Sequence, residues 1–175
     1  MQARLVVVAI VAALPSIAAA QSNPVATAFR DDAKEKAKNL IAAFEEVPAA
    51  KYSYKPTPAQ RTIGEVAVHL AGGNDILCGT IGGAKAPTRA KIAGTDSKDA
   101  LVARLKETFA FCDQALANLD DSKLAEQLPA FGGRTMSRAA LMTLTTGDWA
   151  DHYSQMAIYM RLIGLLPPTA KKPPM

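Results

Sequence analysis

The pattern of apolar and polar positions along the chain predicts four amphipathic helices. In four segments, apolar side chains recur every three or four residues, and polar or charged side chains fill the positions between them. Proline, glycine and capping residues separate the segments, so helix ends can be placed from the sequence alone. The predicted helices cover residues 24–47, 62–80, 98–119 and 138–163.

Local signals explain these boundaries. Thr62, followed three residues later by Glu65, has the spacing of a capping box, and Ser137 can cap the last helix. The connection over residues 120–136 predicts one short helical turn at most, and no segment of the chain shows a convincing strand. Four such helices in one chain predict an all-α fold class with the architecture of a four-helix bundle.

The first residues have the layout of a secretory signal peptide. Arg4 precedes an apolar run, and three alanines end at Ala20. We therefore expect a cleaved signal peptide over 1–20, a bundle domain over 21–166 and a Pro/Lys-rich tail over 167–175, of which the last residues, KKPPM, should be frayed. This pattern predicts a periplasmic or secreted protein without stable membrane insertion after cleavage. An uncleaved N-terminal anchor is the alternative.

Charge and composition limit the kinds of partner that the protein is expected to bind. The net charge of +4 is small and its lysines are scattered, so we expect no nucleic-acid partner. Beyond the N-terminal run, no segment is apolar enough to cross a membrane. There is no G-x-S-x-G signature, no C-x-x-C pair and no phosphate-binding loop.

The chain has two cysteines, Cys78 and Cys112. An even number of cysteines in an exported protein favours a disulfide, which would join the second and third predicted helices. The alternative is that both cysteines are buried free thiols. A catalytic thiol is disfavoured, because no charged neighbour in the sequence would lower the pKa of either cysteine.

Three residues form a candidate metal site: His69, Asp148 and His152. Asp148 and His152 are one helical turn apart, on the stripe of the last helix expected to face the bundle interior. A buried carboxylate must be paired, hydrogen-bonded or bound to a metal. If the second helix brings His69 to the same place, two imidazoles and one carboxylate can hold a divalent metal such as Zn, Ni, Fe or Mn.

Simpler interpretations exist for the same residues. Aspartate and histidine at this spacing also stabilise helices without a metal, and His69 could be an ordinary boundary histidine. Gln155 could orient a ligand histidine or be a plain boundary residue. Aromatic and methionine side chains near the pair could line a pocket, but such side chains usually form the core; they are Trp149, Tyr153, Met156 and Tyr159.

Two stretches resemble the DinB-like family. The segment RTIGEVAVHLAGGND, residues 61–75, is similar to that family's second helix, in which a T-x-x-E-x-x-x-H-L stretch supplies a ligand histidine. The segment GDWADHYSQMAIYMRLIGLLPP, residues 147–168, is similar to its last helix. There an H-x-x-x-H pair precedes a glutamine, Y-L-R, a glycine and two prolines.

The resemblance assigns His69 and His152 to two ligand histidines of the family. Asp148 stands where the first histidine of the last-helix pair normally lies. This departure implies either a site of two histidines and one carboxylate, or a degenerate site that no longer binds metal. The family further implies a four-helix bundle, often dimeric, with a divalent metal among the helices.

The family's characterised activities include thiol-dependent transferases and a thiol-dependent isomerase. An exported protein has poor access to cytoplasmic thiols, which disfavours a thiol transferase here. We therefore expect an exported metal-dependent hydrolase or transferase acting on an unidentified small molecule. The alternatives are a non-enzymatic periplasmic binding protein, and a structural bundle in which Asp148 and His152 only pair with each other.

Overall fold

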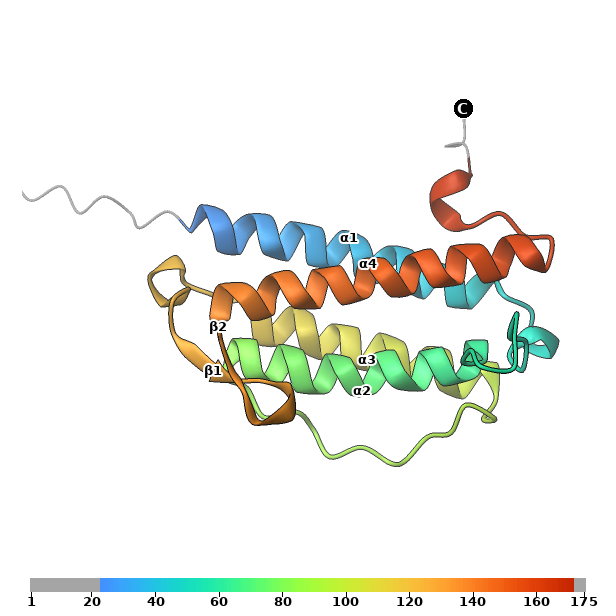
Figure 1. Cartoon of the computed structure of the whole chain (residues 1–175), viewed down its shortest axis with the longest axis horizontal. Coiled ribbons are helices and arrows are strands. Elements are labelled where there is room, and N and C mark those ends of the chain that lie inside the picture. The colour runs from blue at the N-terminus through green and yellow to red at the C-terminus, as the bar shows by residue number, and fades with distance from the viewer. Residues whose placement is uncertain (1–22, 172–175) are drawn as a thin grey trace, which may run out of the picture.

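The computed structural model describes residues 23–171 and shows four long helices packed as a bundle (Figure 1). The predicted fold class is therefore confirmed. The predicted signal peptide over residues 1–20 lies outside the described residues. The four helices are α1 (Pro24–Glu46), α2 (Ile63–Gly82), α3 (Lys98–Leu116) and α4 (Arg138–Leu162).

Capping side chains fix the starts of three helices. Thr62 and Glu65 form the predicted capping box: the Glu65 amide donates to Thr62 Oγ1, and the Thr62 amide donates to Glu65 Oε2 at 2.7 Å. Ser97 and Ser137 accept hydrogen bonds from the first turns of α3 and α4. At the other end of α2, Gly83 ends the helix in the left-handed conformation, with φ of 67°.

All four helices contribute to one apolar core. Each presents a stripe of apolar side chains to the centre of the bundle, and burial of this surface is the main stabilising contribution. The largest fully buried side chains are Trp149, Tyr159, Phe44, Leu40, Ile63, Leu70, Ile81, Leu101, Leu105, Leu141, Met156 and Met160. None of the helices within residues 23–171 is long and apolar enough to cross a membrane.

Helices α2 and α4 lie side by side and run antiparallel. Near one end of the pair, the Tyr159 hydroxyl on α4 donates to the Arg61 carbonyl just before α2, at 3.1 Å. Near the other end, Leu77 and Thr80 of α2 line the same pocket as Leu141 of α4. This register places residues from the middle of both helices opposite one another.

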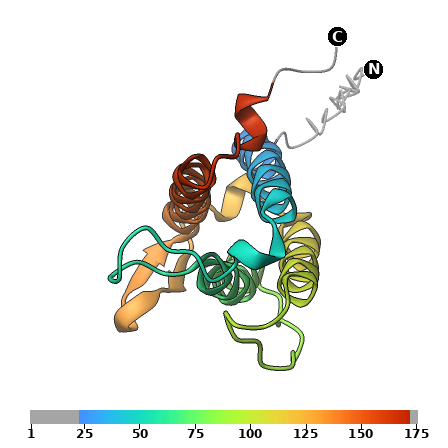
Figure 2. The same ribbon diagram turned by 90° about the vertical axis from the view of Figure 1, so that its right-hand side faces the viewer.

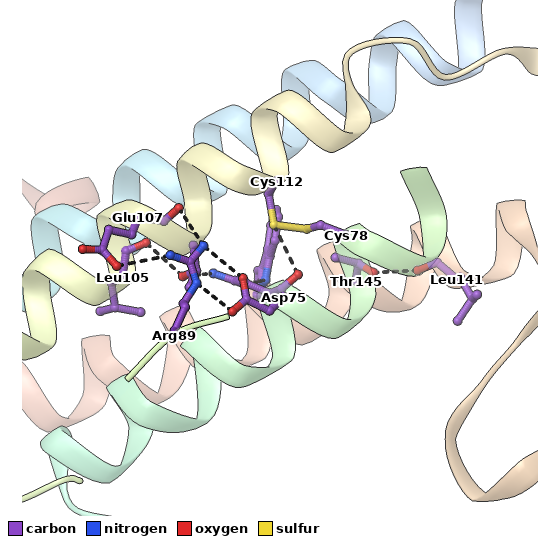
Figure 3. The surroundings of a disulfide bond; sticks show 11 residues. Asp75, Cys78, Arg89, Leu105, Glu107, Cys112, Leu141 and Thr145 are labelled. Carbon is purple, nitrogen blue, oxygen red and sulfur yellow. Dashed lines mark hydrogen bonds and ion pairs between the residues drawn. A yellow bond between two sulfur atoms is a disulfide. The ribbon is translucent and has the colours of Figure 1, made fainter. Parts of the chain in front are cut away.

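A disulfide joins α2 to α3 (Figure 3). It links Cys78 to Cys112 across a Cα–Cα distance of 5.1 Å, and both residues are buried. The predicted bridge is therefore present, and the alternative of two free thiols is wrong. Neither cysteine is available as a nucleophile in this state.

A cluster of ion pairs near the disulfide fastens the long connection between α2 and α3 (Figure 3). Arg89, in that connection, contacts Asp75 at 2.9 Å and Glu107 at 3.2 Å. The Arg104 side chain contacts the same Glu107 and donates to the Ala90 carbonyl. The connection is thus held along the outside of the two helices.

The connection between α3 and α4 contains a small β-hairpin, so the expectation of no strand was wrong. Its strands pair antiparallel and turn through Gly132 and Gly133, both at positive φ. Three-residue strands are too short to show the alternation that reveals a strand in a sequence. The short elements are η1 (Ala49–Lys51), η2 (Asp121–Lys123), β1 (Gln127–Pro129), η3 (Phe131–Gly133), β2 (Thr135–Ser137) and η4 (Pro168–Ala170).

The start of the C-terminal tail packs against the bundle. The KKPPM stretch that was expected to fray lies outside the described residues, except for Lys171. Thr169 exchanges hydrogen bonds with the Tyr153 hydroxyl on α4, at 2.9 and 3.0 Å. Lys171 forms an ion pair with Glu46 at the end of α1, at 2.8 Å. These contacts explain why the chain continues as a packed turn after its prolines.

Candidate metal centre

The antiparallel register of α2 and α4 brings His69, Asp148 and His152 together. His152 Nε2 lies 3.6 Å from Asp148 Oδ1. The rings of His69 and His152 meet edge to face, with centroids 4.9 Å apart. Each of the three residues offers one ligand atom, and these atoms all lie within 4.8 Å of one another. The convergence that the sequence left open is therefore present.

The donor set fits a divalent cation. Protein ligands surround a Zn²⁺ ion at about 2.0–2.2 Å, which places neighbouring donor atoms roughly 3–4 Å apart. The 3.6 Å between His152 Nε2 and Asp148 Oδ1 lies in this range, and no two of the three ligand atoms are more than 4.8 Å apart. Two imidazoles and a carboxylate suit Zn, Fe, Ni or Mn, and three ligands leave positions for water or substrate.

The lone pairs of this cluster are largely unused. Neither the His69 imidazole nor the Asp148 carboxylate has a hydrogen-bond partner among residues 23–171. The contact of Asp148 with His152 at 3.6 Å is too long for a hydrogen bond. Three donors with free lone pairs that converge on one point form an arrangement suited to a cation.

The site lies at the edge of the bundle and not in its interior, which corrects the expectation from the apolar stripe. The side chains of Asp148 and His152 are 35% and 12% exposed, and His69 is exposed. Trp149, the next residue after Asp148, takes the inward direction and is 1% exposed. The site is therefore open to solvent at His69 and Asp148, while His152 is mostly covered.

A hydrogen-bond chain sets the tautomer of His152. The Arg61 carbonyl can only accept, so the Tyr159 hydroxyl donates to it. Tyr159 then accepts from the Gln155 amide nitrogen at 3.1 Å, which turns Gln155 Oε1 toward His152 Nδ1 at 3.0 Å. His152 must donate from Nδ1, and its Nε2 lone pair is free on the side of Asp148. Gln155 thus orients the His152 ring, which is the contact expected of a residue that supports a candidate ligand.

Local electrostatics favour a neutral His69. Burial of part of the ring lowers the pKa of His69 below 6.5, and the positive charge of Arg61 lowers it further, with a smaller effect from His152. The Asp148 carboxylate acts in the opposite direction but is the weakest of these influences on the pKa. At neutral pH His69 is therefore the uncharged imidazole that metal binding requires.

Glu65 is a poor candidate for a general base. Hydrogen bonds from the Thr62 backbone and side chain lower the pKa of Glu65 below its ordinary value. Its carboxylate is occupied in the capping box of α2. The structure thus supports the simpler, capping role of this residue.

Sequence reasoning missed the buried polar network behind the site. Asn74 is fully buried and accepts a hydrogen bond from Trp149 Nε1 at 2.9 Å. Its amide nitrogen donates to Thr108 on α3 at 3.1 Å. A buried asparagine within an apolar stripe was the available signal, but its partners lie on two other helices. Trp149, Met156 and Tyr159 belong to the core, while Tyr153 is half-buried and contacts the tail.

Comparison with models of known protein families identifies the family of this chain. The model of the DinB superfamily matches residues 33–156, which include all three candidate ligands and most of the four helices. The chain belongs to the DinB superfamily. No curated protein matches this DinB superfamily chain.

Solved DinB-like structures share the fold of this DinB superfamily member. A DinB-like protein from Bacillus cereus ATCC 10987 matches with a TM-score of 0.67 at 18% identity, covering 81% of this chain and 95% of the other. A DinB-like protein from Bacillus subtilis gives 0.56 at 20% identity, covering 87% and 96%. A conserved protein of Enterococcus faecalis gives 0.62 at 12% identity, covering 79% and 96%. At these identities the likeness concerns the fold alone.

Proposed function

We propose that this DinB superfamily protein is an exported, metal-dependent enzyme that hydrolyses or transfers a group on a small molecule. The observation that carries the proposal is the convergence of His69, Asp148 and His152, with unused lone pairs, at a solvent-accessible edge. A divalent cation bound there would supply Lewis-acid chemistry, polarising a substrate oxygen or lowering the pKa of a water.

The chain's own residues have distinct roles in this proposal. His152 presents a fixed Nε2 lone pair because Gln155 holds its other nitrogen. His69 contributes a neutral imidazole from the facing helix. Asp148 supplies a negative charge, which gives the site harder ligand character than three histidines would.

Export is part of the proposal and rests on the sequence. The pattern over residues 1–20 is that of a signal peptide, and the Cys78–Cys112 disulfide suits an oxidising compartment. A periplasmic or secreted location disfavours activities that consume cytoplasmic thiols. Hydrolysis or group transfer with another acceptor is therefore preferred.

A second candidate function follows from Asp148 itself. If aspartate at this position marks a degenerate site, the protein is a non-enzymatic periplasmic binding or structural bundle. The observation favouring this alternative is that Asp148 is 35% exposed, so its charge can be stabilised by solvent without any cation.

Metal content tests the site on which the first candidate depends, and an activity screen of the metal-loaded protein then separates an enzyme from a non-enzymatic binding protein. We would purify the untagged protein from the periplasm and measure bound metal by elemental analysis, then titrate Zn²⁺, Ni²⁺, Mn²⁺ and Fe²⁺ into the metal-free chain. We expect about one equivalent in the wild type, lost in Asp148→Ala and His152→Ala. Asp151→Ala is the matched control, because Asp151 is an exposed carboxylate on the same helix. A wild-type chain that takes up none of the four ions would contradict the proposal.

A further inference from the structure

An exposed apolar side chain lies on the same face of α2 as His69. Ile76 follows His69 by seven residues, which is nearly two helical turns, so both side chains point in similar directions. Ile76 is 58% exposed, although it is a large apolar side chain. Exposed apolar surface of this kind marks binding sites when it is part of a larger patch.

Ile76 also lines a pocket between α2, α4 and the β-hairpin. Phe131, at the tip of the hairpin, is 49% exposed and forms one wall of this pocket. None of the pocket's residues is charged, and only one side chain carries a polar atom. The pocket is lined by Ile76, Leu77, Thr80, Pro129, Ala130, Phe131 and Leu141.

The pocket and the metal centre lie along the same seam between α2 and α4. His69 faces His152 in the middle of this seam, and Leu77 lines the pocket with Leu141 further along it. The rise of an α-helix places Ile76 about 10 Å from His69 along α2. The two views show the hairpin beside these two helices, at the end of the bundle where α4 begins (Figures 1 and 2).

Glycines occupy the α2 positions between the metal centre and the pocket. Gly72 and Gly73 lie one turn after His69, and a Cβ atom added at either would meet no other atom within 4 Å. The same is true of Gly147, next to Asp148 on α4. The space beside these backbones is open, so no side chain at these positions blocks the path from the three ligands to Ile76.

We propose that the substrate is an amphiphile. Its polar, metal-binding group lies at His69, Asp148 and His152, and its apolar chain or ring system extends past the glycines into the hairpin pocket. This inference rests on the proposed metal-dependent function and adds the substrate class. Ile76 and Phe131 are its specificity-determining residues, because they provide the exposed apolar walls.

Alkyl hydroxamic acids test the proposal, since they combine a metal-binding head group with a tail of adjustable length. We would titrate the Zn²⁺-loaded full chain with the acetyl, butanoyl, hexanoyl, octanoyl and decanoyl compounds by calorimetry. Affinity should change little for the short tails, which end beside the glycines. It should then rise by about fourfold for each methylene that enters the pocket.

Three surface variants assign any gain in affinity to the pocket. Ile76→Gln and Phe131→Ser should each reduce the gain of the octanoyl over the acetyl compound by about tenfold, in proportion to the apolar area removed. Ile158→Gln is the matched control, because Ile158 is 56% exposed on α4 but does not line the pocket. It should leave the gain unchanged, and all three variants should bind Zn²⁺ like the wild type.

The outcomes separate failure of this inference from failure of the metal function. If Zn²⁺ binds but affinity is independent of tail length, the amphiphile proposal is overturned and the metal centre stands. If no ion binds, both fail, and the preceding metal titration shows it. A third outcome would also overturn the inference: Ile76→Gln and Phe131→Ser convert a dimer to a monomer in sedimentation velocity but do not affect hydroxamate binding. In that case a second copy of the chain covers the pocket.

Discussion

Two polar clusters lie next to each other on α2 and α4, and they differ in what their polar atoms do. In the interior cluster, Asn74 accepts from Trp149 and donates to Thr108, so both ends of its amide are satisfied. In the edge cluster, His69 and Asp148 have no hydrogen-bond partner among the described residues. The interior cluster joins three helices, whereas the edge cluster keeps its lone pairs available.

This difference shows that two adjacent residues of one helix can have different roles, one in the core and one in a candidate binding site. Asp148 and Trp149 are neighbours in sequence, yet one is 35% exposed and the other 1% exposed. Both polar ends of the buried Asn74 amide are hydrogen-bonded to other side chains, so this amide serves to join helices. At the edge of the bundle, His69 and Asp148 are partly exposed and have no hydrogen-bond partner among the described residues, so they remain available to a cation and its further ligands.

The strongest test of the comparison replaces each of these two neighbours by alanine. Trp149→Ala should lower the free energy of unfolding by about 3–5 kcal/mol, because it leaves a large cavity in the core. Asp148→Ala should change it by less than about 0.5 kcal/mol while abolishing metal binding. Urea denaturation followed by circular dichroism measures both variants. An equally large loss in Asp148→Ala would mean that the carboxylate is structural.

Removing the disulfide tests whether the buried contacts of α2 and the candidate metal centre are independent of each other. The double variant Cys78→Ala/Cys112→Ala should lose roughly 3–4 kcal/mol of stability, since the bridge closes a loop of intermediate length in the unfolded chain. The sequence separation of the two cysteines is 34 residues. Zn²⁺ affinity of the folded double variant should remain that of the wild type, because the bridge joins α2 to α3 and not to α4. A large drop in affinity would show that the two clusters are coupled.

Changing Gln155 tests the edge cluster alone. Gln155→Leu removes the acceptor for His152 Nδ1 and should weaken metal binding by about 10–100-fold. Gln155→Glu keeps an acceptor at that position and should restore most of the affinity. Competition with a chromophoric chelator measures both constants. If the leucine variant binds as tightly as the wild type, the hydrogen-bond chain from Arg61 does not orient the ligand.

The smallest expected effect is the pH dependence that His69 contributes to the metal-free protein. Because the pKa of His69 is lowered in the folded state, the unfolded chain binds its proton first as the pH falls below about 6.5. Stability from this residue is therefore present above that pH and is lost toward the lower, folded-state pKa. His69→Gln should show a shallower decline in urea midpoint between pH 7 and 5. Identical slopes in both proteins would contradict the assignment.

Much of the fold could be predicted because its signals are local. The apolar repeat of each helix and the capping pairs, such as Thr62 with Glu65, depend only on residues close in sequence. The helix ends agree with the predicted ones to within a few residues. The hairpin escaped prediction because its strands contain only three residues each. Its contacts with α2 and α4 are between residues far apart in the sequence or belong to the assembled bundle.

The candidate site could be predicted only in part. The spacing of Asp148 and His152 showed that they share a face. His69 was a candidate because the chain has only two histidines, and the family resemblance supported it. Periodicity could not show whether that face meets the interior or the edge, because Trp149 is only about 100° further around the helix. The answer depends on where α2 lies, which is a property of the assembled bundle. The partners of Asn74 were hidden for the same reason.

The disulfide described above has a consequence for the order in which the molecule is completed. Both cysteines precede α4 in the chain, so the disulfide between α2 and α3 can form before α4 has been synthesised. Two of the three candidate ligands arrive on that last helix. A chain that ends in the β-hairpin would therefore contain both cysteines but only one of the three candidate metal ligands, His69.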